Sequence, residues 1–270
     1  MTQTIFITGA STGLGRAAAA LFAGRGWNVF ATMRNPDAAG DLAQTPGITV
    51  LRLDVRRADQ IAEAARAALA QGPVDVLFNN AGYGLAGAFE GASDDQLVDE
   101  IETNLLGVMR VTQAFLPAMR ERRQGVILTT TSIGGLVTFP FNSVYHATKW
   151  GLEGWSESLA YELAPFGVRV RTLAPGGIAT DFAGRSLVRT SHPAYLEAME
   201  KVIAVFSDPE RRAHASSAEQ IAEAAYAAAT DTSDRVTFVA GEDAKALYAQ
   251  RLEAGVEPFR TAVRAQFLGA

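Results

Sequence analysis

The stretch "TIFITGASTGLGRAAAALFAGRGWNVFATMRN", residues 4–35, decides the fold of this 270-residue chain. A short apolar run at 4–8 leads into a glycine-rich turn, an alanine-rich helical pattern and a second apolar run at 28–32. Both runs are too continuously apolar to have one solvated face, which is typical of parallel strands covered by helices on both sides. The stretch therefore predicts two parallel strands connected through a helix.

The same alternation continues along the chain. Further strands are expected at 48–53, 74–79, 125–131, 168–174 and 235–239, and helices at 14–25, 59–71, 94–123, 143–164 and 218–230. Strands that alternate with helices over short loops predict a Rossmann-type α/β fold, a doubly wound parallel sheet of about seven strands with helices on both faces. Because no linker-like segment divides the chain, we expect a single domain over residues 1–270.

Two segments depart from this alternation. Residues 180–216 contain no predicted strand and carry an amphipathic set of apolar residues, so we expect a lid over the substrate. The C-terminal segment, 242–270, is expected to add one or two helices. Such an extension either covers a pocket or forms a contact between subunits.

Composition excludes several classes of function. Twenty-four basic residues stand against 29 acidic ones, a net charge of −5 without any basic block, which disfavours nucleic acid and anionic membranes as partners. The chain has no cysteine, and His146, His192 and His214 lack metal-ligand spacing, so no metal site is expected. No signal-peptide pattern or apolar run of ~18 residues is present. These features predict a soluble cytoplasmic protein.

The glycine-rich turn "TGASTGLG" predicts a dinucleotide site. Gly9, Gly13 and Gly15 permit a tight turn in which backbone N–H groups approach an anion, and the following helix begins with its positive dipole end there. Glycines also form ordinary turns, so the motif alone is weak. Its position directly after the first strand favours the nucleotide site.

The end of the second strand indicates which cofactor binds. An NAD-binding protein would place a carboxylate there, whereas this chain has Met33 and then Arg34, which can accommodate a 2′-phosphate. We therefore expect NADP(H) in preference to NAD(H), although a solvated loop arginine is the alternative. Asp54, after the third strand, could hold the adenine amino group or simply cap a helix.

A second stretch, "SVYHATKWG" at residues 143–151, carries the candidate chemistry. Tyr145 and Lys149 share one helix face, and a neighbouring cation favours the phenolate, so we expect a lowered pKa for Tyr145. Such a phenol can donate a proton to a carbonyl oxygen. Ser132, at the end of a strand, could hydrogen-bond the same oxygen. Taken singly, each residue also has a structural explanation: a cap, a half-buried tyrosine or a solvated lysine.

The motifs "TGASTGLG", "NNAG", "NLLG" with Asn104, Ser132, "YHATK" and "APGGIAT" occur in the order and spacing of the short-chain dehydrogenase/reductase family, which the chain resembles over about residues 4–180. "NAGYGLAGAFE", "FLPAMR" and "ESLAYELAPFGVRV" are similar to the 17β-hydroxysteroid-dehydrogenase-like and retinol-dehydrogenase-like branch. No single motif is specific, but the combination is.

The resemblance implies roles for individual residues. Tyr145 would be the general acid/base, Lys149 would lower its pKa and bind the nicotinamide ribose, and Ser132 would polarise the substrate oxygen. Asn104 would bend its helix and hold a water molecule in a proton relay through Lys149. The cofactor would be contacted by Tyr145 and Lys149 together with Gly9, Ser11, Thr12, Gly13, Leu14, Gly15, Arg34, Asp54, Val55, Asn80, Ala81, Gly82, Pro175, Gly176, Ile178 and Thr180.

The candidate substrate residues are mostly apolar. Because ligands of open α/β sheets lie beyond the carboxyl ends of the strands, the substrate is expected beside Ser132, Tyr145, Tyr83, Gly134, Phe139, Phe141 and Phe182. This set predicts a hydrophobic ketone or aldehyde and its alcohol. Several of the aromatic residues would equally fit packing of the lid. His146 follows Tyr145 where the family usually has a small residue. It could be a second donor to the substrate, but packing against its helix neighbours is its expected role.

We therefore expect an NADP(H)-dependent carbonyl reductase or alcohol dehydrogenase. The alternatives are a non-catalytic NADP-binding sensor, an NAD-dependent dehydrogenase of hydroxysteroid-like alcohols, and a different reaction such as epimerisation or dehydration. The family is usually dimeric or tetrameric, which implies a homo-oligomer with contacts through the helices at 94–123 and 143–164.

Overall fold

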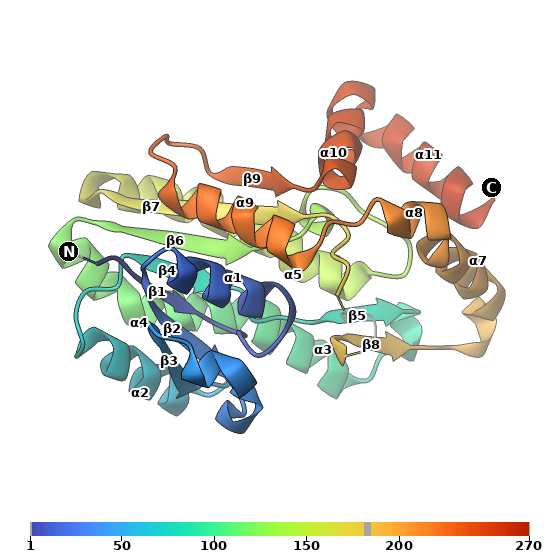
Figure 1. Ribbon diagram of the computed structural model, residues 1–270. Coiled ribbons are helices and arrows are strands. Elements are labelled where there is room, and N and C mark those ends of the chain that lie inside the picture. The colour runs from blue at the N-terminus through green and yellow to red at the C-terminus, as the bar shows by residue number, and fades with distance from the viewer. Residues whose placement is uncertain (1, 181–184, 270) are drawn as a thin grey trace.

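Seven strands pair in the order β3-β2-β1-β4-β6-β7-β9, and each of these pairings is parallel (Figure 1). The structure is a computed structural model that describes residues 2–180 and 185–269. All seven predicted strands are present with ends within two residues of those expected, which confirms the doubly wound fold. The strands are β1 (Thr4–Ile7), β2 (Asn28–Met33), β3 (Ile48–Arg52), β4 (Val76–Asn79), β6 (Gly125–Thr130), β7 (Val168–Pro175) and β9 (Thr237–Ala240).

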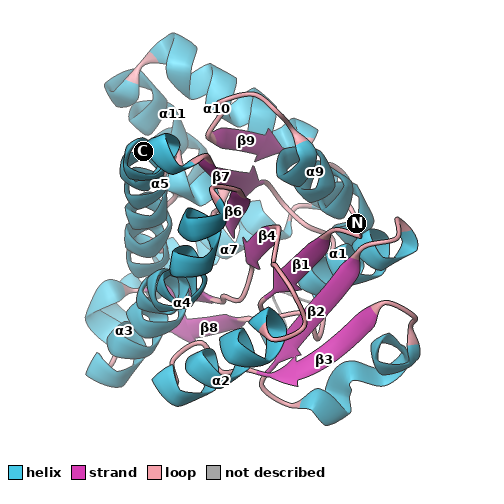
Figure 2. Cartoon of the chain, turned by 90° about the vertical axis from the view of Figure 1, so that its left-hand side faces the viewer, coloured by secondary structure: helices cyan, strands magenta, loops and turns pink. Residues whose placement is uncertain are grey.

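Helices cover both faces of the sheet (Figure 2). On one face α1 (Gly13–Gly24) and α9 (Ala218–Thr230) pack on the side chains of Ile5 and Ile7. On the other face α2 (Ala58–Leu69), α4 (Gly107–Arg122) and α5 (Ser143–Leu163) pack on Phe6 and its neighbours. Successive residues of a strand point to opposite faces, so a continuously apolar strand is buried on both sides.

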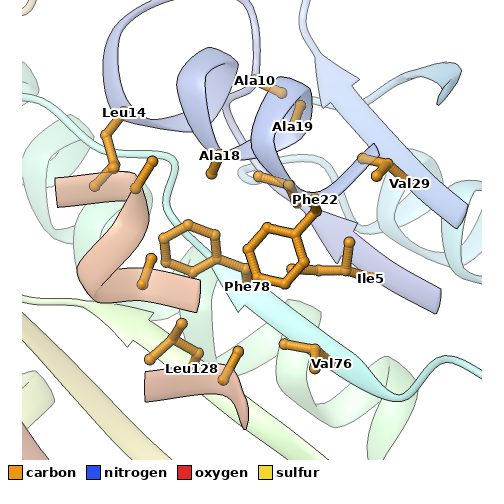
Figure 3. Packing of buried hydrophobic residues seen from close by; sticks show 14 of the residues in the cluster. Ile5, Ala10, Leu14, Ala18, Ala19, Phe22, Val29, Val76, Phe78 and Leu128 are labelled. Atoms are coloured by element: carbon orange, nitrogen blue, oxygen red, sulfur yellow. The ribbon is translucent and has the colours of Figure 1, made fainter. Parts of the chain in front are cut away.

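Alanines determine how closely α1 and α9 lie over the sheet. Ala18 and Ala19 of α1, and Ala222 and Ala225 of α9, are completely buried. Their small side chains let the helices approach each other, and Phe22 fills the space between them and the strands (Figure 3). The alanine-rich sequence thus supplies both helix propensity and close packing.

The predicted helix at 94–123 is interrupted, which corrects the sequence-based expectation of one continuous helix. It consists of α3 (Asp94–Ile101), a π-helical turn at Glu102–Leu106, and α4. A π turn inserts one residue into the helical ladder and leaves the apolar periodicity on either side nearly intact. The hydrophobic pattern therefore gives no sign of the turn.

A second, two-stranded parallel sheet joins distant segments, and the expectation that 180–216 contains no strand is wrong. In it β5 (Gly84–Gly87) pairs with β8 (Leu187–Thr190). Gly87 has φ +136°, and a side chain there would collide with the backbone of Thr190. Glycine is therefore required for the strands to lie this close.

The remaining helices form a separate layer at one end of the molecule (Figure 1). They are α7 (Leu196–Ser207), α8 (Pro209–Ala213), α10 (Glu242–Ala254) and α11 (Val256–Leu268). Val202, Phe259 and Phe267 form an apolar cluster with Ile133 and Val137, which follow β6. Short 3₁₀ segments lie at Pro36–Gln44, Phe89–Gly91, Ile133–Gly135, Ala164–Phe166 and Pro193–Tyr195. Among the described residues, no helix combines the length and apolarity needed to cross a membrane.

A buried arginine caps the end of α9. The side chain of Arg171, in β7, is 0% exposed, and its guanidinium donates to the carbonyl oxygens of Ala228, Asp231 and Ser233. The last carbonyls of a helix have no partners within the helix, and buried carbonyls without partners are costly. Arg171 thus joins β7 to α9.

Replacement of Arg171 by methionine should destabilise the fold, because the three carbonyl oxygens lose their donor. We expect the free energy of unfolding to fall by about 3 kcal/mol and the melting temperature by roughly 6–12 °C. Urea denaturation measures the former. Arg169→Met, two residues away on the exposed surface, is the matched control and should change stability by less than about 0.5 kcal/mol. Equal stability of the two variants would contradict the capping role.

Candidate active site

The central strands of the sheet end along one edge. β1, β4, β6 and β7 are neighbours and parallel, so their carboxyl ends face the same way. The strand order reverses between β1 and β4, and this switch point is where open α/β sheets bind ligands. The glycine-rich turn, "NNAG", Ser132 and "PGGIAT" each follow one of these strands. The fold therefore brings the predicted motifs together.

The glycines allow the turn after β1 to lie against the segment after β4. Gly9 has φ +70°, and a Cβ there would lie 2.8 Å from the Cα of Ala81. A Cβ on Gly15 would collide with the carbonyl oxygen of Gly9 and lie 2.6 Å from Nδ2 of Asn80. Gly13 adopts φ +54° at the start of α1. Larger residues at Gly9 or Gly15 would separate the two segments.

The beginning of α1 offers its backbone N–H groups to a ligand. In α1, all of whose residues are described, no side chain caps the N-terminus and no acidic residue lies in the first turn. The first N–H groups of a helix have no partners within the helix and carry partial positive charge. Ser11, Thr12, Gly13 and Leu14 form this end, which suits the pyrophosphate of a dinucleotide.

Asn80 joins the ends of three strands. The backbone N–H groups of Asn80 and Ala81 donate to Oγ1 of Thr8 at 2.9 and 3.0 Å. The side-chain Nδ2 of Asn80 donates to the carbonyl oxygen of Thr8 at 3.1 Å, and Oγ1 of Thr130 donates to Oδ1 of Asn80 at 3.3 Å. Nζ of Lys149 donates to the carbonyl oxygen of Thr130 at 2.9 Å. One polar network thus runs from the glycine-rich turn to Lys149.

The residues expected near the adenosine lie at the ends of β2 and β3. Arg34 is exposed, and its charge acts on Asp54. The backbone N–H of Arg56 donates to Oδ1 of Asp54 at 3.0 Å, and its guanidinium lies 3.3 Å from Oδ2. Burial raises the pKa of Asp54, but the Arg56 hydrogen bonds and positive charge outweigh burial, so the pKa is lowered. Val55, the residue after Asp54, is buried. The guanidinium of Arg16, in α1, donates to the carbonyl oxygen of Ala39.

The segment after β7 closes on the glycine-rich turn. β7 ends at Pro175, Gly176 follows, and the side chain of Thr180 would meet a Cβ on Gly13 at 3.7 Å. Ile178 forms a parallel bridge with Ser216. These contacts place Pro175, Gly176, Ile178 and Thr180 along the same edge as the predicted cofactor residues.

The hydroxyl groups of Ser132 and Tyr145 lie side by side, and their interaction lowers the pKa of Tyr145. Oγ of Ser132 also accepts from the backbone N–H of Gly134 at 2.9 Å. A Cβ on Gly134 would lie 3.3 Å from that oxygen and 3.4 Å from Cε1 of Tyr145. The glycine thus leaves the space beside both hydroxyls free of a side chain.

Lys149 and Tyr145 lie on one face of α5, as their spacing predicted. The ammonium of Lys149 is 5.7 Å from the centre of the Tyr145 ring. The lysine side chain is nearly buried, and its bond to Thr130 fixes it at the end of β6. Two hydroxyls and one cation therefore converge next to the network of Asn80.

The expected lowering of the pKa of Tyr145 by Lys149 is not what these protein groups produce. Burial of the hydroxyl raises the pKa of Tyr145 to about 12, the Ser132 hydrogen bond lowers it, and the charge of Glu100 raises it further. Burial also lowers the pKa of Lys149 to about 8. Loss of water disfavours both charged forms and is the largest cause of each shift. Residue spacing alone does not reveal this desolvation.

Asn104 occupies the π turn and is completely buried. Its Oδ1 accepts from the backbone N–H of Tyr83 at 3.0 Å, while Nδ2 donates to the carbonyl oxygen of Tyr83 at 2.7 Å and to Oε1 of Glu100 at 2.9 Å. A Cβ on Gly82 would lie 2.9 Å from Oδ1 of Asn104 and 3.8 Å from Nζ of Lys149. The carboxamide is thus fixed close to the lysine.

Sequence reasoning missed three acidic residues at this edge. Glu100 precedes Asn104 by one helical turn and is completely buried; Glu153 follows Lys149 by one turn and accepts from Oγ1 of Thr172 at 2.9 Å. Asp243 accepts from the backbone N–H of Gly177, after β7, at 2.7 Å. Helical spacing from Asn104 and Lys149 was a usable signal for the two glutamates. It was not used because helical glutamates are usually solvated.

The predicted substrate residues lie in different surroundings. Burial raises the pKa of the Tyr83 hydroxyl to about 12, and the negative charge of Glu100 acts in the same direction. The Phe139 ring packs against Phe206 and Phe267 with ring centres 5.8 and 5.7 Å apart. Phe141 has φ +59°, and its ring centre lies 6.3 Å from that of Tyr195. Phe182 lies outside the described residues.

His146 is buried in the contact between α5 and the segment after β6. Its Nδ1 lies 3.1 Å from the carbonyl oxygen of Val137, and its ring makes a T-shaped contact with Phe139. Burial lowers its pKa to about 4, so the imidazole is neutral at pH 7. The residue packs within the helix layer, as expected.

The chain matches known proteins in sequence and in structure. The family model described as short chain dehydrogenase matches residues 3–189. The chain is 41% identical to human 17-beta-hydroxysteroid dehydrogenase type 1 over 194 residues, which cover 68% of this chain and 59% of that protein. A short-chain dehydrogenase from Streptomyces avermitilis superposes with a TM-score of 0.85 and 34% identity, covering 94% of this chain and 93% of the other. A short chain dehydrogenase from Burkholderia cenocepacia, solved in complex with NADP, superposes with a TM-score of 0.78 and 25% identity. The match covers 99% of this chain and 98% of that one.

Gly15→Ala should disrupt the dinucleotide site, because the added methyl would push the turn away from Asn80. We expect the dissociation constant for NADPH, measured by fluorescence titration, to rise at least tenfold, since overpacking typically costs about 1–3 kcal/mol. Gly24→Ala is the matched control at the other end of α1, where a Cβ would meet nothing within 4 Å. It should bind NADPH as the unmodified protein does. An unchanged dissociation constant for Gly15→Ala would contradict the close approach of the two segments.

Proposed function

The chain is an oxidoreductase of the short-chain dehydrogenase family, and from this premise we propose that it interconverts a hydrophobic ketone or aldehyde and its alcohol with NADP(H). The observation that carries the proposal is the convergence of Ser132, Tyr145 and Lys149 beside the glycine-rich turn. A protein that only sensed NADP would not need two hydroxyls and a buried ammonium at that place.

Tyr145 is the proposed proton donor. With a pKa of about 12, its phenol stays protonated at neutral pH and can give a proton to a carbonyl oxygen as that oxygen gains negative charge. The Ser132 hydroxyl, which already contacts Tyr145, would hydrogen-bond the same oxygen. In the reverse direction, the phenolate form of Tyr145 would accept the proton of the alcohol. A charged Lys149 would assist by stabilising the phenolate.

The residues at the carboxyl edge fit a nicotinamide dinucleotide. The uncapped start of α1 suits the pyrophosphate, and Lys149, beside Asn80, is available for the hydroxyls of the nicotinamide ribose. When bound, the nicotinamide would carry the hydride. Exposed Arg34 favours the 2′-phosphate of NADP(H), and the Burkholderia cenocepacia relative was solved with NADP. These features support NADP(H) in preference to NAD(H).

The proposed substrate is hydrophobic. Gly134 leaves room beside the two hydroxyls, and Phe139 and Phe141 lie on the segment that follows them. The human relative is named for a hydroxysteroid, a bulky apolar alcohol. The ring of Phe139 packs on α7 and α11, so it would support the residues that line the site. We propose contact with the substrate for Tyr83, Gly134 and Phe141.

The helical layer and the exposed face of α5 have proposed roles as well. The described part of the predicted lid packs on the segment after β6 through Phe206 and Phe139, which supports a cover over the substrate. On α5, Trp150 and Tyr161 are 40% and 74% exposed, which supports α4 and α5 as contact surfaces of a homodimer or homotetramer.

Tyr145→Phe tests the proton donor. It removes one hydroxyl, so we expect the turnover of aromatic and bulky aliphatic ketones, followed by NADPH absorbance, to fall at least about a thousandfold. The dissociation constant for NADPH should change less than about threefold, a free-energy difference of about 0.7 kcal/mol. Tyr161→Phe, on the exposed face of the same helix, is the matched control and should retain full turnover. Retained turnover in Tyr145→Phe would refute the assigned role.

Arg34→Asp tests the choice of cofactor. A carboxylate at this position would repel the 2′-phosphate and remove a charge-assisted hydrogen bond. We expect NADPH to bind at least thirtyfold more weakly, a free-energy loss of about 2 kcal/mol, while NADH binding changes less than about threefold. NADH thus serves as the control ligand. Equal weakening of both would show that Arg34 does not recognise the phosphate.

A further inference from the structure

Lys149 is an unusual lysine in this protein. The chain contains three lysines, and Lys201 and Lys245 are exposed and paired with Glu197 and Glu242 at 2.9 and 2.7 Å. Lys149 instead is 6% exposed, and its hydrogen bond goes to the neutral carbonyl oxygen of Thr130. Among the described residues, no carboxylate lies within 4.0 Å of its ammonium. A buried charge needs compensation, and none is in direct contact.

Glu100 supplies a negative charge at longer range. Its side chain is 0% exposed in α3, and Oε1 accepts from Nδ2 of Asn104 at 2.9 Å. The other end of that carboxamide, Oδ1, and the ammonium of Lys149 both lie beside Gly82, where a Cβ would be 2.9 Å from the former and 3.8 Å from the latter. One carboxamide therefore separates the carboxylate from the ammonium. In a poorly hydrated interior, such a distance still permits strong attraction.

The charged and titratable groups around this pair come from α3, from α5 and from the segments after β3 and β4. The negative charges of Glu100, in α3, and Glu153, in α5, raise the pKa of Lys149, and the ring centre of Tyr145 lies 5.7 Å from its ammonium. Three groups lower the pKa of Glu100. They are the charge of Lys149, the N–H of Leu85 and the hydroxyl of Tyr83, which follows β4. The charge of Asp99 raises the pKa of Tyr83, and the charge of Arg56 lowers it.

Of the two glutamates, Glu100 has the larger influence on Lys149. One carboxylate oxygen of Glu153, Oε2, accepts from the hydroxyl groups of Thr172 and Thr237 at 2.9 and 3.5 Å. Glu100 instead contacts Asn104, a residue that also approaches Lys149. The geometry therefore connects Glu100 to both.

We propose that Glu100 is a positioning residue whose carboxylate keeps the buried ammonium of Lys149 protonated and fixes the carboxamide of Asn104. Its use in catalysis rests on the proposed function, because a charged Lys149 matters there for Tyr145 and for the cofactor ribose. The electrostatic part concerns protein groups alone and can be tested without a substrate.

The protonation states agree with this role. Burial raises the pKa of Glu100 to about 7 and lowers that of Lys149 to about 8, each opposed by attraction to the other. Above pH 8 Lys149 loses its proton, and below pH 7 Glu100 gains one. Without the carboxylate, the pKa of Lys149 would fall further, so more of the lysine would be neutral at pH 7–8.

The test is a pH titration of lysine by nuclear magnetic resonance. The full chain is labelled with ¹³C at lysine Cε, and Lys149→Met identifies the Lys149 signal among the three. Lys201 and Lys245 serve as internal references, and thermal unfolding checks that each variant is folded. Glu100→Gln removes the charge with little change of shape; Asp95→Asn removes one exposed charge from the same helix and is the matched control.

We expect Glu100→Gln to lower the titration midpoint of Lys149 by at least about one pH unit, and Asp95→Asn to leave it within about 0.2 units. An unchanged midpoint in Glu100→Gln would overturn the proposal. If this variant does not fold, Glu100→Leu replaces it, because an apolar residue of similar volume is often tolerated at a buried charged position. The same shift is expected there, and its absence would be equally decisive.

Kinetics separate this inference from the proposed function. The rate of ketone reduction by Glu100→Gln is divided by that of the unmodified protein at the same pH. We expect this ratio to be at least threefold lower at pH 8 than at pH 6. An equal loss at both pH values would indicate a purely structural residue and contradict the positioning role. A shifted Lys149 midpoint in a protein that reduces no carbonyl compound would refute the proposed function alone.

Discussion

The burial of one ammonium group at the carboxyl edge of the sheet constrains the rest of the site. Lys149 can be held there because it donates to the carbonyl oxygen of Thr130 at the end of β6, and because the charges of Glu100, in α3, and Glu153, one turn further along α5, favour its ammonium form. The π turn places Asn104 between this cation and Glu100. Removal of water makes each of these interactions stronger and each unpaired group more costly. The polar groups of the site therefore depend on one another.

Much of the fold was predictable from the sequence. The seven strands follow from continuous apolar runs, and the site motifs follow those strands at the edge where the order reverses. The β5–β8 pair was not predictable, because "GLAG" has neither β-branched residues nor alternation. Its pairing depends on the absence of a side chain at Gly87. The π turn was missed because periodicity on either side of it is almost unchanged.

In the candidate site, the sequence predicts which residues lie close together, but it does not predict how deeply they are buried. Helical spacing placed Tyr145 and Lys149 on one face, and the structure agrees. The expected direction of the pKa of Tyr145 was opposite to that found, because the cost of losing water depends on the layers above the helix. Glu100 and Glu153 were overlooked for a related reason: their burial follows from tertiary packing, which a pattern of charged residues on a helix does not reveal.

The small β5–β8 sheet connects the segment after β4 to the segment that leads to α7. β5 continues directly from Gly82 and Tyr83, and β8 belongs to the segment that leads to α7. The N–H of Gly84 donates to the carbonyl oxygen of Ser186 at 2.7 Å, and Oγ1 of Thr190 to that of Ala88 at 2.8 Å. Amide hydrogens in such a pair exchange with solvent only when the pair separates. The segment after β4 and the segment that leads to α7 would therefore separate only when this pair opens.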